Sequence, residues 1–369
     1  MRSFAINTTK NLSGGARIIA RKIKSLLRAN PLYKDRYVKV YEKYISQKIA
    51  ATIRKEIISK KQVYIVYDHS CSCLAYGEFF HHLMLARFFL TQNLKVSFLI
   101  IDGEYRTDFQ DERAFSRAQQ FLAEEIDFAN FIAGAYRSNF LCKKVSWKEG
   151  NTELTQASLN ESVYIYQHEL VVQRLPIYRR SFNVVNHLVH GLDEDLTKKI
   201  LLNSLELGNC WGKFDLLPKQ PYLALNVRYN PDWSTQRNTT ESLFVNAIKK
   251  LNSYYPNLSI IVVSDRLGCN YFMEVAQKNS IDCLFSKNLD LPESFISDVL
   301  LVLGAIKYFQ VNGGGLGCIL LFSSTPFTII APIINEIMWT KRKLVSWQAS
   351  DQVFKNFYYT GDDAQILLD

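Results

Sequence analysis

The feature that most constrains the fold is a regular alternation of strand-like and helix-like segments after residue 221. Short apolar runs with the length of buried strands alternate with longer segments of helical periodicity. Strands are expected at 222–227, 259–263, 282–285, 308–311 and 327–330, and helices at 241–254, 271–278, 295–305 and 318–322. This alternation predicts a doubly wound parallel sheet, which binds its ligand at the carboxyl ends of the strands.

A weaker form of the same pattern precedes it. The run 63–67 is strand-like, 77–91 is helical and 96–101 is strand-like again, which makes one β-α-β unit. The short apolar segments 162–166 and 184–185 are consistent with further strands of this sheet. Parallel sheets are therefore expected in both halves of the chain.

The length of the chain supports two domains. Its 369 residues, 48% of them hydrophobic, are sufficient for two packed cores. Prolines at 218 and 221 mark the stretch 213–221 as a hinge. We expect an α/β protein with two Rossmann-like domains, at 62–215 and 216–348, between an N-terminal helical arm at 1–61 and a C-terminal tail or helix at 349–369.

The net charge of +9 is concentrated in the arm. Residues 1–61 carry 16 Lys and Arg against three acidic residues, whereas the remainder is slightly acidic. This distribution argues against a nucleic-acid-binding enzyme, which would present its positive charge on the folded face. Within the arm, 15–28 predicts an amphipathic basic helix that either lies on an anionic membrane surface or packs on the protein itself.

No segment has the roughly 20 consecutive apolar residues of a membrane span, and the N-terminus lacks the apolar core of a secretory signal. Seven scattered cysteines indicate reduced thiols rather than a disulfide framework, and their spacing predicts no metal site. We therefore expect a cytoplasmic protein that is either free or peripheral on the inner face of the membrane.

Candidate ligand-binding residues follow three of the expected strands. Arg228 follows the first strand of the second half and offers a planar, permanently charged fork for a diphosphate; pairing with Asp232 is the alternative. The run Asn312-Gly313-Gly314-Gly315 leads from a strand into a helix, where backbone N–H groups can bind phosphate, although a tight turn would have the same composition. Asp265 could receive a nucleotide hydroxyl or base, or could cap a helix.

These residues lie in segments that resemble a known family. The stretch 221–233, with Asn226 and Arg228 at its centre, resembles the first donor motif of the fucosyltransferase superfamily, especially the protein O-fucosyltransferases, in which a His-x-Arg core precedes a Gly-x-Asp-Trp-like end. Arg228 falls on the catalytic arginine of that family. Ser264-Asp265 resembles its second motif, 298–317 its third, and Tyr76-Gly77-Glu78 its Phe-Gly-Asn segment.

The resemblance implies a GT-B fold, a donor in the C-terminal half, and an inverting sugar transfer that needs neither metal nor cofactor. The chain departs from the family at Asn226, Asn230 and Glu78, where the family has histidine, glycine and asparagine. It also departs at the run 312–315, called the glycine loop below, where the family has serines. These departures leave the sugar open, with GDP-fucose as one donor and UDP- or CMP-linked sugars as others.

Sugar transfer needs stabilisation of the leaving diphosphate and removal of a proton from the acceptor hydroxyl. Arg228 and the glycine-loop amides suit the first task. Glu78, Asp68 and His69 are candidates for the second because all lie near the ligand edge of the first half. The expected acceptor is a glycan or a lipid-linked saccharide. The alternative is a catalytically silent sugar-nucleotide-binding or scaffold protein, since a fold alone does not establish activity.

Overall fold

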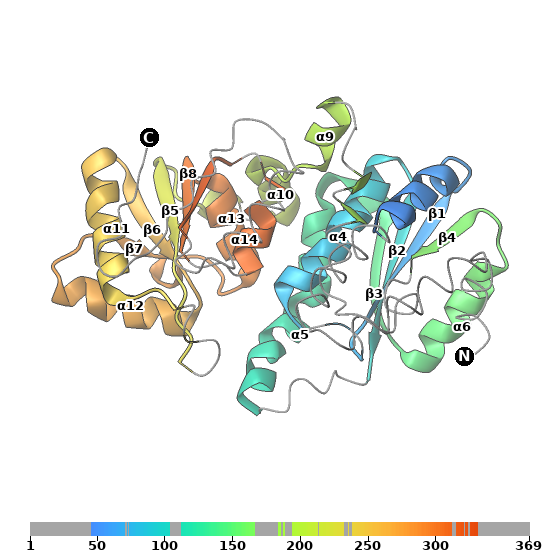
Figure 1. The fold of residues 1–369 in the computed structure, drawn as a ribbon, viewed down its shortest axis with the longest axis horizontal. Coiled ribbons are helices and arrows are strands. Elements are labelled where there is room, and N and C mark those ends of the chain that lie inside the picture. The colour runs from blue at the N-terminus through green and yellow to red at the C-terminus, as the bar shows by residue number, and fades with distance from the viewer. Residues whose placement is uncertain are drawn as a thin grey trace, which may run out of the picture.

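The computed structural model describes residues 46–70, 72, 74–103, 112–166, 184–185, 187–188, 194–212, 214–231, 235, 238–311, 315–320, 322–323 and 325–330. The described residues form two halves, each built on one sheet of parallel strands (Figure 1). The expected α/β class with two Rossmann-like halves is therefore confirmed.

The first sheet has the strand order β3-β2-β1-β4. Its strands are β1 (Gln62–Asp68), β2 (Lys95–Asp102), β3 (Phe140–Ser146) and β4 (Val163–Tyr166). Helices α4 (Tyr76–Thr91) and α5 (Glu112–Ala133) lie on one face of the sheet, and α6 (Trp147–Ser158) lies on the other (Figure 1). The central strand β2 is a near-continuous apolar run because both faces of a covered parallel sheet are buried.

Helix α4 is the most deeply buried helix of the first half. Every residue from Phe79 to Thr91 is buried, so the helix is enclosed on all sides. It packs against α5 and β2 of its own half and against α14 (Gly315–Leu320) of the second half. A helix of this kind joins two layers rather than covering the surface of one.

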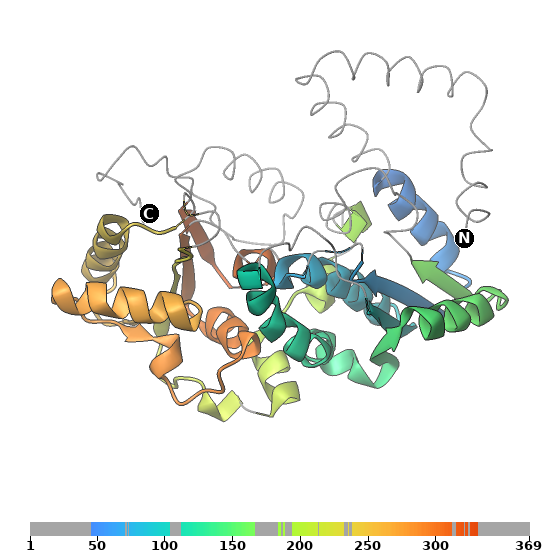
Figure 2. The same cartoon turned by 90° about the horizontal axis from the view of Figure 1, so that it is seen from below.

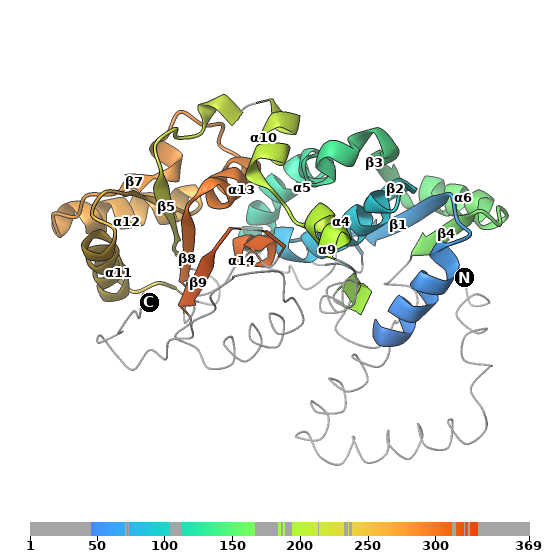
Figure 3. The ribbon, with the colours of Figure 1, turned by 90° about the horizontal axis from the view of Figure 1, so that it is seen from above.

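The second sheet has the order β7-β6-β5-β8-β9, and all its paired strands are parallel. Its strands are β5 (Tyr222–Asn226), β6 (Ser259–Val263), β7 (Leu284–Phe285), β8 (Lys307–Val311) and β9 (Phe327–Ile330). Helices α11 (Glu241–Tyr254) and α12 (Arg266–Lys278) cover the outer face, whereas α13 (Phe295–Gly304) and α14 lie toward the first half (Figure 3). Order 3-2-1-4-5 is that of the nucleotide-binding half of a Rossmann fold.

The two halves share a hydrophobic core. One buried cluster lies between the outer face of the second sheet and helices α11 and α12. A larger cluster runs without interruption from the first sheet through α4 and α5 to α13 and the inner face of the second sheet. Figure 2 shows these helices between the two sheets. Apolar packing across the boundary fixes the halves relative to each other.

Between the halves, the chain forms α9 (Glu194–Ile200), α10 (Ser204–Trp211) and a short 3-10 helix (Phe214–Leu216). Two further 3-10 helices follow α5 and β7: Gly134–Asn139 and Ser286–Asn288. Leu202 in this connection pairs with Ser323 of the second half in an isolated parallel bridge.

Most expected elements are present, with one correction. The segment 184–185, predicted as strand-like, is helical, because two apolar residues alone do not distinguish the two periods. At the end of the predicted arm, 46–57 form a helix whose Ala50 and Ile53 are buried in the shared core. The basic helix predicted at 15–28 and the tail at 349–369 lie outside the described residues.

Every helix in the described part of the chain is too short or too polar to span a bilayer. The described cysteines, Cys142, Cys210, Cys269, Cys283 and Cys318, are free thiols.

Candidate functional site

The second sheet has its topological switch point between β5 and β8. The chain leaves β5 toward β6 on one side, whereas β8 and β9 lie on the other side. Doubly wound sheets bind ligands outside the carboxyl ends of the strands at this point. Arg228 follows β5 after a single residue, and β8 ends at Val311, directly before the glycine loop. The fold thus brings both predicted phosphate-binding segments to one edge.

The backbone around Arg228 is held in place by its own loop. The Arg228 amide donates to Thr239 Oγ1 at 3.0 Å, and the Thr239 amide donates back to the Arg228 carbonyl at 2.8 Å. Asn230 and Asn238 make a second reciprocal pair, at 2.9 and 2.8 Å. The partly exposed Arg228 side chain therefore extends from a fixed base. Asp232, its predicted alternative partner, lies outside the described residues.

Asn226, predicted to bind the donor, joins the ends of two strands. Its buried side chain donates from Nδ2 to the Val263 carbonyl at 2.8 Å. Beside it, Ser264 Oγ donates to the Val227 carbonyl at 2.9 Å. Both bonds connect β5 to β6 at the ligand edge. Asn226 therefore holds the strand end from which Arg228 emerges.

Asp265 caps helix α12. Its Oδ1 accepts the Gly268 amide at 2.7 Å, while the residue itself is exposed at the sheet edge. Position 268 requires glycine, because a Cβ there would lie 2.1 Å from Ser264 Oγ. The helix-cap alternative is observed, and a second role for the carboxylate toward a nucleotide remains a prediction.

A buried ion pair lies near Asp265. Lys287 Nζ donates to Asp298 Oδ2 at 2.6 Å, and both side chains are less than 10% exposed. Burial raises the pKa of Asp298 to about 6, and the neighbouring lysine opposes this shift. Among the described residues, Asp298 Oδ1 has no hydrogen-bond partner. In the sequence, Asp298 stands out as an acidic residue in the first turn of the otherwise apolar helix α13. No sequence pattern marks Lys287 as its partner.

The glycine loop is described only at its end. Asn312, Gly313 and Gly314 lie outside the described residues. Gly315 begins α14, and a Cβ there would lie 3.5 Å from Tyr76 Cβ and 3.7 Å from the Gly77 nitrogen. Gly315 thus lies at the contact between the two halves, where α14 and α4 both begin.

Glu78 lies at this same contact. It is partly exposed in the first turn of α4, immediately after Gly77, whose own added Cβ would lie 3.8 Å from Gly315 Cα. The structure therefore places Glu78 next to the contact between Gly77 and Gly315, the described end of the glycine loop. The two segments are more than 200 residues apart in sequence.

Asp68 and His69 lie at the end of β1 in different environments. Asp68 is partly exposed, and its Oδ1 accepts both the amide and the hydroxyl of Ser70, at 2.9 and 2.6 Å. His69 is fully buried, with Nδ1 3.2 Å from Asp102 and Nε2 3.0 Å from Glu125. An imidazole without solvent exposure cannot contact the hydroxyl of a sugar acceptor, so His69 is not a candidate for removing its proton.

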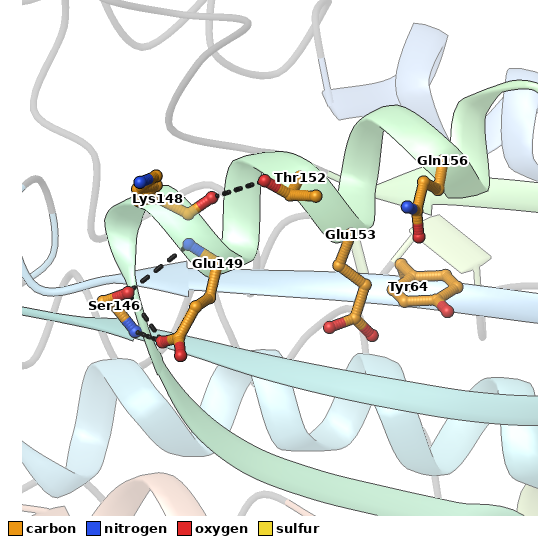
Figure 4. Close-up of a pocket in the computed structure, with 7 residues that line it drawn as sticks. All are labelled: Tyr64, Ser146, Lys148, Glu149, Thr152, Glu153 and Gln156. Carbon is orange, nitrogen blue, oxygen red and sulfur yellow. Dashed lines mark hydrogen bonds between the residues drawn. The ribbon is translucent and has the colours of Figure 1, made fainter.

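The first half also has a hollow of about 760 Å³ beside α6. Figure 4 shows Tyr64 of β1 facing side chains of α6 across it. The lining includes the capping pair Ser146 and Glu149, and it contains none of the predicted site residues. Its lining comes from β1, the end of β3 and α6 of the first half, whereas the candidate donor edge belongs to the second sheet.

No protein-family model matches the chain, and no curated protein matches its sequence. Among solved structures, ADP-heptose LPS heptosyltransferase II of E. coli is 10% identical, with a TM-score of 0.38 over 82% of this chain and 92% of its own. POFUT1 in complex with GDP is 10% identical, with a TM-score of 0.34 over 73% of this chain and 99% of its own.

UDP-GlcNAc 2-epimerase from Neisseria meningitidis, bound to UDP-GlcNAc, is also 10% identical, with a TM-score of 0.34 over 73% of this chain and 82% of its own. Likenesses of this degree identify neither a substrate nor a reaction for this chain.

Proposed function

We propose that the chain is a glycosyltransferase that takes a sugar from a nucleotide-diphosphate donor held at the carboxyl edge of the second sheet. The observation that carries this proposal is the switch point between β5 and β8, where Arg228 and the glycine loop follow adjacent strands. A cationic fork beside a run of backbone amides is suited to a diphosphate. The acceptor, a glycan or a lipid-linked saccharide, would bind on the side of the first half.

In the proposed reaction, the acceptor oxygen bonds to the anomeric carbon while the bond from that carbon to the diphosphate breaks, with inversion. The acceptor proton passes to a carboxylate, for which Glu78 is the first candidate and Asp68 the second. Arg228 and the amides of 313–315 balance the charge that develops on the leaving diphosphate. No metal ion is assigned to this step. The resemblance to fucosyltransferases makes GDP-fucose the first donor to test.

The test is release of free nucleotide from a panel of GDP-, UDP-, ADP- and CMP-linked sugars, followed by substitution of Arg228 with the active donor. Arg228→Ala is expected to lower turnover by about a hundredfold to a thousandfold, because it removes a contact that strengthens as the leaving group gains charge. Arg228→Lys keeps the charge but loses the bidentate fork, so its loss should be smaller.

A matched control is Arg266→Ala. Arg266 lies at the same sheet edge, has equal charge and pairs with the exposed Glu293 at 2.6 Å. The turnover of Arg266→Ala should stay within about threefold of that of the unaltered chain, since exposed ion pairs contribute little to the stability of the fold. Near-normal turnover in Arg228→Ala would remove Arg228 from the site. Donor binding without nucleotide release would instead identify a catalytically silent binding protein.

A further inference from the structure

Glu124 of α5 makes a polar contact between the two halves. Its Oε2 accepts the Tyr76 hydroxyl at 2.6 Å and the backbone amide of Phe295, in the second half, at 3.0 Å. Its Oε1 accepts Gln120 Nε2 at 3.0 Å. One carboxylate thus joins the first residue of α4 to the first residue of α13.

Aromatic rings pack around Tyr76, which donates to this carboxylate. The Tyr76 ring stacks on Phe295 with centroids 3.8 Å apart, and Phe128 meets both rings edge-on at 5.5 and 5.3 Å. Burial, followed by the bond to Glu124, raises the pKa of Tyr76 far above its usual value, so the phenol stays a donor. Hydrogen bonds to a charged acceptor are strong in such apolar surroundings.

Helix α13 gains a partner for an amide that its own turns leave unpaired. Its N-cap, Ser294, accepts the Ser297 amide, and Glu124 accepts the amide of Phe295. A carboxylate at this end also complements the positive end of the helix dipole. The bond therefore stabilises α13 only while the two halves keep their observed orientation.

The same contact fixes the start of α4. Tyr76 is two residues before Glu78, and Gly77 packs against Gly315 of the second half. Displacement of Tyr76 from Glu124 and Phe295 would move Glu78 away from Gly315. We propose that Glu124 is a positioning residue that holds the two halves together and keeps Glu78 beside the donor site. The role given to Glu78 rests on the proposed function, whereas the contact between the halves does not.

The test compares Glu124→Gln, Glu124→Ala and Tyr76→Phe with a matched pair inside the second half. Tyr271 donates to Glu241 at 2.9 Å, so Glu241→Gln and Tyr271→Phe remove the same chemistry without crossing the boundary. In the full chain, amide exchange at 295–300 should become about tenfold faster or more in Glu124→Ala, and less so in the two conservative variants. The controls Glu241→Gln and Tyr271→Phe should show the same rate of amide exchange at 295–300 as the unaltered chain.

With an active donor, Glu124→Gln should lower kcat by about tenfold and leave the donor KM within about twofold, because the donor site itself is intact. Exchange in Glu124→Ala that equals the controls would overturn the contact between the halves. Faster exchange with unchanged kcat would overturn the positioning role. If no donor is turned over, the proposed function fails, and the exchange comparison still decides whether Glu124 joins the halves.

Discussion

Replacing Arg87 by methionine is expected to destabilise the protein by about 4 kcal/mol, because the side chain is a buried charge with many partners. Arg87 of α4 has no solvent exposure, and it binds Glu206 of α10 through both Nη atoms, at 3.1 and 2.9 Å. Its nitrogens also donate to the carbonyls of four residues, Ile132, Lys199, Ile200 and Leu201.

The magnitude follows from what the substitution leaves behind. Removing one partner of a buried ion pair costs about 3–5 kcal/mol, largely for the charge that remains. The Glu206 side chain is 26% exposed, so water recovers part of this loss. Three of the four carbonyls, those of Ile132, Ile200 and Leu201, lose their donor in the interior. An unsatisfied buried group costs about 1–3 kcal/mol, and these costs do not add fully. Arg87→Lys should cost about 2–3 kcal/mol, because an ammonium reaches fewer of these acceptors.

Urea unfolding, followed by circular dichroism and tryptophan fluorescence, measures the change. Arg266→Met is the matched control, since Arg266 also binds its carboxylate through two nitrogens but both side chains are about half exposed. That variant should lose at most about 1 kcal/mol. A loss below about 1 kcal/mol in Arg87→Met would refute the reasoning, because burial would then not distinguish the two pairs.

Two further predictions concern Asp298 and the basic arm. The pKa of Asp298 is raised from 3.8 to about 6, so the folded state holds its proton more tightly than the unfolded state, and the corresponding stability is lost as pH rises from about 4 to 7. Urea unfolding of the unaltered chain and of Asp298→Asn measures this effect: from about pH 4 to 7 the free energy of unfolding of the unaltered chain should fall by about 3 kcal/mol relative to that of the variant. A difference between the two free energies that does not change with pH would contradict the prediction. Deleting 1–45, which spares the packed helix 46–57, should abolish salt-sensitive binding to anionic vesicles and leave donor binding intact; equal vesicle binding by both chains would exclude an arm-dependent membrane contact.

The sequence predicted the second sheet well because its strands are buried on both faces. Such strands read as apolar runs, and the helices between them carry clear caps, as at Thr240 and Asp265. The edge strand β3 had no such signal. It contains Lys143 and Lys144 and is largely half-exposed, so its residues did not stand out as a strand.

The candidate site was predictable where it depends on position along the chain. Arg228 follows a strand in the sequence, and every parallel strand of one sheet ends at the same edge. The environment of His69 was not predictable in this way. Asp102 and Glu125, which enclose it, come from β2 and α5, and only the packing of those elements buries the ring.

The sequence by itself determined the local order of strands and helices, because apolar periodicity and capping are properties of neighbouring residues. It also determined which residues stand at strand ends, and hence the composition of the proposed donor edge. Only the tertiary structure decided that Glu124 joins α4 to α13, that Lys287 pairs with Asp298, and that Gly77 meets Gly315. These contacts join residues far apart in the chain, and their energies depend on burial that arises when the two halves pack together.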